Sequence, residues 1–282
     1  MRFGLSTAPQ RITWPWLREV WKRADDLEVF ESAWTFDHFY PIFGDSTEDC
    51  LEGWITLTAL LAQTERIRGG VLVTAMLYRH PAVLANMAAT LDITSNGRLE
   101  LGVGAGWNEE EATAYGFNLG SMTERFDRFE EGLAVVHGLL TNERTNFDGT
   151  YYQLSDAMNN PKGPQDPLPI CVGGSGLTRT VPLAAKYGQH WNYGSPTMSV
   201  EDFRMRRDVF YQACDTESRD PSEITISTLI MADSFDEVAA AAEIWANEGI
   251  DLALVRLPKG VDPSLLATLA QSLEPLTSNA QQ

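Results

Sequence analysis

Two side chains able to move a proton near neutral pH are adjacent in this sequence. Asp37 and His38 follow the apolar segment Glu31–Phe36. A carboxylate beside an imidazole can bind a hydroxyl group or a cofactor edge and transfer a proton. The alternative is a helix-capping aspartate next to a surface histidine. If the apolar segment is a strand that ends at a pocket, His38 and Asp37 are the candidate catalytic pair.

Two glycine-rich segments have the composition of binding loops. In Leu101–Gly106 three alternating glycines precede Trp107; they either let backbone approach a flat or phosphorylated ligand closely or only mark a bend. Gly173–Leu177 leads from an apolar segment into a predicted helix. Such a turn presents backbone N–H groups and the positive end of the helix dipole, which together bind phosphate. Arg179 either adds a charge-assisted contact there or pairs with a surface carboxylate.

Other kinds of catalytic site lack their characteristic residues. The histidines have neither His-x-His nor His-Glu-x-x-His spacing, which argues against a multi-histidine metal centre, and we expect no metal. We expect His80, which precedes Pro81, to be structural. No lysine falls in a predicted strand, where the Schiff-base lysine of a barrel aldolase would lie, and there is no Gly-x-Ser-x-Gly motif. The sequence therefore predicts that a bound cofactor carries the chemistry.

The elements that must position these residues alternate along the chain. Short apolar segments rich in β-forming residues repeatedly precede longer segments of helical period. Eight strand–helix pairs are predicted: Arg2–Ser6 with Trp14–Leu27, Glu31–Phe36 with Asp49–Gln63, Ile67–Thr74 with Pro81–Thr94, Arg98–Val103 with Ser121–Leu140, Pro169–Val172 with Leu177–Lys186, Gln189–Tyr193 with Ser199–Ala213, Ile224–Met231 with Ser234–Asn247, and Ile250–Leu257 with Pro263–Leu273. This pattern predicts an α/β fold, a (β/α)8 TIM-like barrel whose active site lies at the carboxyl ends of the strands. A doubly wound open sheet is the alternative.

One segment interrupts the alternation after the fourth helix. Residues 141–168 contain a turn signal, Asn146-Phe-Asp-Gly149, and several prolines. We expect this insertion to form a small hairpin and an extended excursion. Residues 1–276 are predicted to form one domain, and residues 277–282 a loose, flexible tail.

The composition narrows the classes of partner. The chain has 282 residues, with 21 Lys+Arg and 39 Asp+Glu, and a net charge of −18, which argues against nucleic acid. No apolar run approaches the roughly 18 residues of a membrane span, and the amino terminus does not resemble a signal peptide. Its three cysteines are widely spaced, which argues against a disulfide framework. We expect a cytoplasmic protein without a membrane partner.

These features resemble the bacterial luciferase-like family of flavin and deazaflavin oxidoreductases. The motifs that carry the resemblance follow one order along essentially the whole chain: Phe36-Asp37-His38-Phe39, Arg79-His80-Pro81, Leu91-Asp92-x-x-Ser95-x-Gly97-Arg98, Leu101–Trp107, Glu124-Arg125-Phe126, Phe147-Asp148-Gly149-x-Tyr151-Tyr152 and Gly173–Gly176. Two stretches, Trp107–Glu111 and Glu124–Phe129, are most similar to the actinobacterial branch usually assigned to coenzyme F420.

The resemblance implies a flavin or deazaflavin ring lying across the carboxyl ends of the strands. In the family, a non-proline cis peptide in the third strand forms a bulge behind the ring, and here it would fall near Val71-Leu72. Asp37 and His38 match the pair beside the ring. The implied cofactor contacts are Asp37, Val71, Leu72, the backbone of Ala105 and Gly106, and the phosphate cradle of Gly173, Gly174, Ser175, Gly176 and Leu177.

The function that the resemblance implies is hydride transfer between C5 of F420 and an unidentified small organic substrate, with His38 as acid/base and Asp37 orienting ring or substrate. Sugar-phosphate dehydrogenases of this branch carry an acidic proton donor where this chain has Trp107, and an aromatic residue where it has Ile42, which disfavours sugar-phosphate oxidation. Trp107 is expected to form a wall for an apolar or aromatic substrate, or to pack in the core.

Three other functions are compatible with the sequence. One is an FMN-dependent luciferase-like monooxygenase that uses reduced flavin and oxygen. Another is a flavin-binding protein without turnover, and a more distant one is a metal-dependent barrel hydrolase. Because members of the family are often dimers, we also expect a homodimer.

Overall fold

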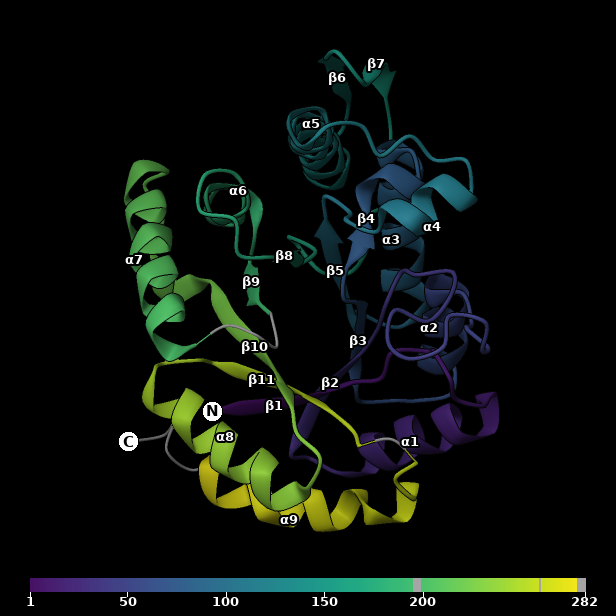
Figure 1. Ribbon diagram of the computed structural model, residues 1–282. Coiled ribbons are helices and arrows are strands. Elements are labelled where there is room, and N and C mark those ends of the chain that lie inside the picture. The colour runs from purple at the N-terminus through teal and green to yellow at the C-terminus, as the bar shows by residue number, and fades with distance from the viewer. Residues whose placement is uncertain (195–198, 259, 278–282) are drawn as a thin grey trace.

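A closed parallel barrel forms the centre of the protein (Figure 1). The computed structural model describes residues 1–194, 199–258 and 260–277. The strands of these residues pair in the order β3 (Arg68–Val71), β2 (Phe30–Thr35), β1 (Arg2–Ser6), β11 (Leu252–Arg256), β10 (Thr225–Met231), β9 (His190–Tyr193), β8 (Ile170–Gly173), β5 (Leu99–Gly104) and β4 (Thr74–Ala75). Pairing of β3 with β5 closes the ring. β3 and β4 both pair with β5 and are consecutive parts of one strand position in the ring. The nine strands of the described residues therefore fill eight positions, and the predicted eight-stranded barrel is confirmed.

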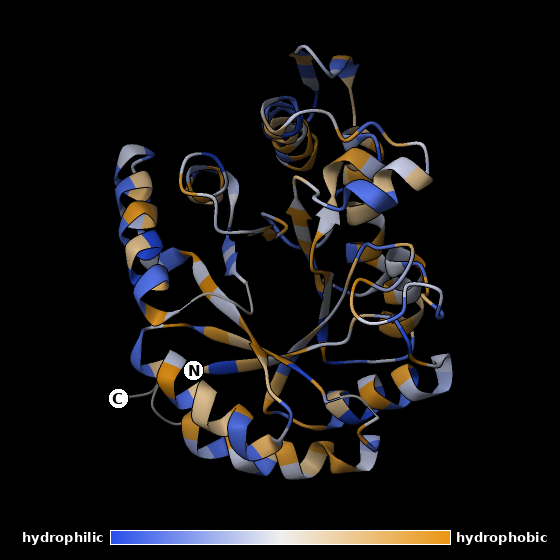
Figure 2. Cartoon of the chain, viewed as in Figure 1, coloured by the Kyte–Doolittle hydropathy of each residue, from blue (hydrophilic) through white to orange (hydrophobic). Residues whose placement is uncertain are grey.

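Helices follow the strands and cover the outside of the barrel (Figure 1). They are α1 (Trp14–Asp26), α2 (Gly53–Leu61), α3 (Pro81–Thr94), α4 (Glu109–Ala114), α5 (Met122–Thr141), α6 (Thr180–Tyr187), α7 (Val200–Thr216), α8 (Phe235–Asn247) and α9 (Leu266–Thr277). Figure 2 shows both apolar and polar residues along these helices, as expected for elements with one buried face. No helix of the described residues is both long and apolar enough to cross a membrane.

Local capping explains where several helices begin. Ser121 accepts a hydrogen bond from the N–H of Glu124, whose carboxylate accepts one from the N–H of Ser121, so the predicted capping box is present. His80 caps α3 by accepting from the N–H of Ala82 at 3.2 Å, which confirms its structural role. The short helix α4 was not predicted, because six residues are too few to show a helical period.

The third strand differs from the prediction of one continuous segment. β3 ends at Val71 and β4 starts at Thr74. The peptide bond between Leu72 and Val73 is cis, one residue beyond the predicted position Val71-Leu72. The backbone between the two short strands therefore bulges out of the regular sheet at the rim of the barrel.

The interior of the barrel is filled by one large side chain. Trp34 is fully buried, together with Cys171, Leu252 and Leu254. A Cβ atom at Gly70 would lie 2.4 Å from the Trp34 ring, so this glycine provides the space that the indole occupies. The larger core lies between the strands and the surrounding helices.

The segment after α5 contains the predicted hairpin. β6 (Thr145–Asp148) pairs antiparallel with β7 (Gln153–Ala157). The carboxylate of Glu131 in α5 accepts three backbone N–H groups of the turn, from Thr150, Tyr151 and Tyr152, at 2.7, 2.8 and 3.1 Å. Of the predicted tail, Thr277 is the last residue of α9, and residues 278–282 lie outside the described residues.

Candidate active site

The predicted site residues lie along one rim of the barrel. All of the barrel strands are parallel, so their carboxyl ends meet at the same end. His38 follows β2, Gly106 follows β5, and Gly173 ends β8. The fold thus brings together residues that are more than 130 positions apart (173 − 38 = 135).

Asp37 is held inside the protein by an ion pair. The carboxylate is 2% exposed and accepts two hydrogen bonds from Arg79, at 2.6 and 2.9 Å, and one from the N–H of Ala75 at 3.0 Å. Burial raises the pKa of Asp37, against the opposing effect of Arg79. Arg79 also contacts Glu52 at 2.9 Å. Asp37 therefore joins β2 to the segment around β4, and its oxygens are occupied by protein donors.

His38 contacts a buried glutamate that the sequence did not single out. Its Nδ1 lies 2.7 Å from Oε2 of Glu111, whose side chain is fully buried. Glu111 also accepts hydrogen bonds from the N–H of Phe39 and, at 2.9 Å, from the hydroxyl of Tyr78. Burial opposes the charge of Glu111, but the hydrogen bonds from His38 and Phe39 outweigh it and lower the pKa of this carboxyl.

The contact between His38 and Glu111 determines which imidazole nitrogen carries the proton. A carboxylate can only accept, so Nδ1 of His38 carries the proton that Glu111 receives. Nε2 is then the atom that can take a proton from a ligand or return one. Burial, followed by the charge of Glu111, raises the pKa of Tyr78, so that its hydroxyl stays protonated and donates. The result is an oriented acid/base group at the rim.

Trp107 lies beside this histidine on the surface. Its side chain is 61% exposed, and the ring centroids of Trp107 and His38 are 5.5 Å apart. The alternative of core packing is therefore wrong. On its other side, His38 contacts the edge of Phe36 at 5.0 Å between centroids. The imidazole is flanked by two aromatic rings, one of which is open to a ligand.

The alternating glycines of β5 make room for the neighbouring third strand. A Cβ atom at Gly102 would lie 2.0 Å from the carbonyl oxygen of Val71, and one at Gly104 would lie 2.6 Å from the Val73 side chain. A Cβ atom at Gly173, at the end of β8, would also lie 2.6 Å from the Val73 side chain. These glycines are thus required by the bulge itself.

Beyond β5, the chain bends at Ala105 and Gly106. Gly106 has a φ of +82°, and a Cβ there would lie 2.5 Å from Leu77. Of the two residues predicted at the bulge, Val71 is buried in the core, whereas Leu72 is partly exposed. Leu72, Ala105 and Gly106 can therefore contact a ligand on the rim, while Val71 supports them from behind.

The segment Gly173–Leu177 leads from the end of β8 into the loop before α6. Gly174, with a φ of +124°, donates its N–H to the carbonyl of Asn192 at 3.0 Å. The next three N–H groups, those of Ser175, Gly176 and Leu177, have no acceptor among the described residues. Helix α6 begins at Thr180, three residues later than predicted, so the loop extends further into the rim.

Arg179 does not point its charge into this loop. It pairs with Asp127 at 2.8 Å and Glu130 at 3.1 Å, both in α5. The interpretation of Arg179 as the partner of a surface carboxylate is confirmed. An anion at the loop would therefore be held by backbone N–H groups rather than by this guanidinium.

Comparison with known proteins identifies the family. The family described as luciferase-like monooxygenase matches residues 1–270 of the chain. The protein belongs to this family. The luciferase-like chain is 32% identical over 228 residues to the F420-dependent hydroxymycolic acid dehydrogenase of Mycobacterium tuberculosis, covering 79% of this chain and 61% of that protein. It is 33% identical over 167 residues to the F420-dependent glucose-6-phosphate dehydrogenase of Amycolatopsis mediterranei, covering 58% of this chain and 47% of that one.

Solved structures share the fold of this luciferase-like protein. An F420-dependent secondary alcohol dehydrogenase in complex with an F420-acetone adduct superposes with a TM-score of 0.85 at 19% identity, over 97% of both chains. The monooxygenase RslO1 from Streptomyces bottropensis superposes with a TM-score of 0.82 at 20% identity, over 98% of both chains. By contrast, this chain spans about half to three-fifths of the length of the two curated relatives.

A second polar cluster lies at the other end of the barrel. Glu100, Cys171 and His190 place three possible metal-ligand atoms within 4.8 Å of one another, which their sequence positions did not indicate. His190 already contacts Glu100 through Nδ1 and, at 2.5 Å, the hydroxyl of Ser227 through Nε2. Burial raises the pKa of Cys171 well above its usual value. Since the imidazole is satisfied and the thiol protonated, the cluster is a hydrogen-bonded part of the luciferase-like barrel.

Proposed function

We propose that this luciferase-like protein is an F420-dependent oxidoreductase that transfers a hydride between C5 of the deazaflavin and a small organic substrate. The observation that carries the proposal is the oriented His38–Glu111 pair, which lies on the rim that also holds the Leu72–Val73 bulge and the loop of free donors. Two curated relatives at 32% and 33% identity are named F420-dependent dehydrogenases, which supports this cofactor.

The residues of the rim fit such a cofactor. Leu72 and the backbone of Ala105 and Gly106 offer a smooth, uncharged face for a flat ring. The three N–H groups of residues 175–177, which have no acceptor in the described part of the chain, supply donors for its phosphate, as a glycine-rich loop before a helix does elsewhere. When bound, F420 supplies a two-electron hydride donor or acceptor at C5. We take Gly173 and Gly174 as the entry to this loop.

The side chains of the chain then hold the substrate and move its proton. Glu111 keeps the proton of His38 on Nδ1, which leaves Nε2 free to accept the proton of a substrate hydroxyl or to return one to a carbonyl oxygen. Trp107 covers one side of this position with an exposed aromatic face. Asp37 acts through Arg79 and Ala75, because it holds the bulge in place behind the ring.

The cofactor is tested by titrating the purified protein with F420 and with FMN and measuring fluorescence. We expect F420 to bind at least tenfold more tightly than FMN. Leu177→Asp places a negative charge in the donor loop and is expected to weaken F420 binding more than tenfold. The control Leu265→Asp, at a 45% exposed position in the turn before α9, should leave binding unchanged. Tight FMN binding without F420 binding would refute the proposal.

The FMN-dependent monooxygenase remains the alternative, because the family description names that activity. It predicts oxygen uptake coupled to hydroxylation of a product when reduced FMN is supplied. F420-dependent hydride transfer needs no oxygen. Activity that is equal in air and under argon therefore favours the proposed function.

A further inference from the structure

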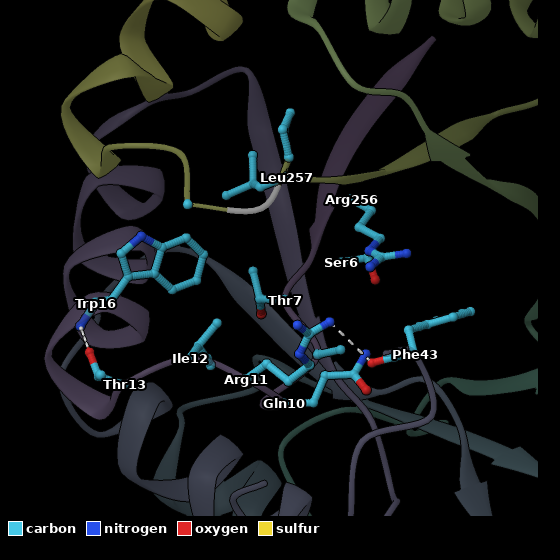
Figure 3. A pocket seen from close by; sticks show the side chains of 13 residues that line it. Ser6, Thr7, Gln10, Arg11, Ile12, Thr13, Trp16, Phe43, Arg256 and Leu257 are labelled. Carbon is cyan, nitrogen blue, oxygen red and sulfur yellow. Dashed lines mark hydrogen bonds between the residues drawn. The ribbon is translucent and has the colours of Figure 1, made fainter. Parts of the chain in front are cut away.

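A cavity of about 300 Å³ lies beside the carboxyl ends of β1 and β11. Its apolar wall is formed by Ile12, Trp16, Phe43 and Leu257, and Figure 3 shows the indole of Trp16 at one side and Arg256 at the other. The cavity lies at the same end of the barrel as His38, because β1 and β11 run parallel to β2 and its lining residues follow their carboxyl ends. It is within the size range of small-molecule sites, at the lower end.

The charge of the cavity lining is opposite to that of the protein. Two arginines, Arg11 and Arg256, line it, and no carboxylate of the described residues does, although the chain as a whole carries a net charge of −18. Arg11 is already bound to Glu48 at 2.6 Å and to the carbonyl of Phe43 at 3.4 Å. Among the described residues of the lining, the positive charge that remains is that of Arg256.

Arg256 has no oxygen acceptor among the described residues. Its Nη1 contacts the sulfur of Met231 at 3.4 Å, and the guanidinium lies 4.6 Å from the ring centroid of Phe43. The other half-buried arginines of the described chain each donate to at least one oxygen: Arg11, Arg68, Arg79, Arg98, Arg125, Arg128, Arg179, Arg206, Arg207 and Arg219.

Nearby acids do not neutralise this guanidinium. Asp233 and Glu237 border an adjacent depression that Arg256 also lines, yet neither comes within the 4.0 Å of an ion pair with it. Glu237 instead accepts a hydrogen bond from the N–H of Asp233 at 3.0 Å. A guanidinium has five N–H donors in a planar fork, and those of Arg256 are available to a ligand.

Two neutral donors also line the cavity. Ser6 is the register partner of Arg256 across β1 and β11, and its hydroxyl has no partner among the described residues. Gln10 is only 7% exposed, and its Oε1 accepts the N–H of Ile42 at 2.8 Å. The amide nitrogen of Gln10 has no acceptor in the described chain, so a second neutral donor lines the cavity.

We propose that this cavity binds the carboxylate of a small apolar or aromatic organic acid. The planar fork of Arg256 matches a carboxylate with two parallel hydrogen bonds, and Ser6 and Gln10 supply neutral donors. The hydrocarbon part lies against Trp16, Ile12 and Leu257. A doubly charged phosphate is a poorer match, because the described residues of the lining offer it one unpaired cation. That this acid is the substrate rests on the proposed function, whereas the binding itself does not.

Binding is tested without any cofactor, by isothermal titration with benzoate, 3-phenylpropionate and hexanoate, with the amide of each acid, and with inorganic phosphate. We expect at least one acid to bind more than tenfold more tightly than its amide. Arg256→Gln should reduce the affinity for that acid to the level of its amide, and Arg256→Lys should recover part of the loss. Arg23→Gln removes the same charge from an exposed position of α1 and should change nothing.

Other outcomes overturn the inference. The inference is wrong if every acid binds as tightly as its amide, or if Arg256→Gln binds the acid as tightly as the wild type. It is also wrong if phosphate binds more tightly than any of the acids. If Arg256→Gln lacks the circular dichroism and melting curve of the wild type, Ser6→Ala and Arg256→Lys serve in its place, and an acid-selective loss is still required. Because F420 is absent from these titrations, a failure of the proposed function leaves their result standing.

Discussion

Replacement of Glu111 by glutamine tests the central contact of the site. The carboxylate accepts from His38, Phe39 and Tyr78, and its side chain is fully buried. A glutamine has one acceptor oxygen, so its NH₂ group must face either the N–H of Phe39 or the His38–Tyr78 pair. One donor is then left unpaired, or His38 must move its proton from Nδ1 to Nε2.

The expected loss of stability follows from the number of donors that Glu111→Gln leaves without an acceptor. A buried donor left without its acceptor costs about 1–3 kcal/mol, so we expect Glu111→Gln to lower the free energy of unfolding by about 2 kcal/mol. For a chain of this size that is a fall of about 4–8 °C in melting temperature. Glu110→Gln, at the exposed neighbouring position in α4, should stay within about 0.5 kcal/mol of the wild type.

The contribution of Glu111 to the free energy of unfolding depends on pH with a defined sign. The pKa of Glu111 is lower in the folded protein than its usual value of 4.5, so the charged form stabilises the fold above about pH 4.5 and this stabilisation is lost as the pH falls through the folded-state value. The difference between wild type and Glu111→Gln should therefore narrow at acid pH. Urea unfolding from pH 7 down to about pH 3, which spans the region below the usual pKa of 4.5, measures this difference.

A nitrogen NMR spectrum of the histidine side chains provides the second readout. The wild type should show the His38 tautomer with its proton on Nδ1, and Glu111→Gln should show a shift of population toward Nε2. The reasoning is refuted if Glu111→Gln is as stable as Glu110→Gln at pH 7 and the His38 signals do not change.

Two further predictions concern the rim. Gly104→Ala places a methyl group 2.6 Å from Val73 and should destabilise the protein by about 1–3 kcal/mol; Val73→Ala in the same chain should restore much of this in urea unfolding, and a failure of the double variant to recover would contradict the proposed packing. His38→Ala should lower the rate of F420-linked turnover by about 10²–10⁴-fold while the dissociation constant for F420 changes less than threefold, and an unaltered rate would favour a binding protein without turnover.

The barrel could be predicted because its pattern is local. Short apolar segments of β-forming residues followed by longer segments of helical period recur along the chain, and caps such as Ser121 with Glu124 mark the helix starts. The interruption between β3 and β4 was implied by the family resemblance, which misplaced the cis bond by one residue. The start of α6 was missed because Leu177 continues an apolar pattern into a loop.

The location of Asp37 and His38 on the rim followed from the sequence, because the carboxyl ends of parallel strands face one way. The residues that Asp37 and His38 contact could not be predicted from the sequence. The sequence does not distinguish the three consecutive glutamates Glu109, Glu110 and Glu111 from one another. Only the docking of α4 buries the last of them. The pairing of Asp37 with Arg79 likewise depends on how the segment around β4 folds back.

The sequence by itself therefore determined the family, the eight strand–helix units and the end of the barrel where chemistry can occur, since these depend on periodicity and chain order. Only the tertiary structure decided which donors and acceptors are already paired. It left Arg256 without an oxygen acceptor among the residues that the structure describes, and it gave His38 a buried carboxylate. The reason is physical: hydrogen bonds and ion pairs act over about 3 Å, and positions at that distance are set by the packing of elements far apart in the chain.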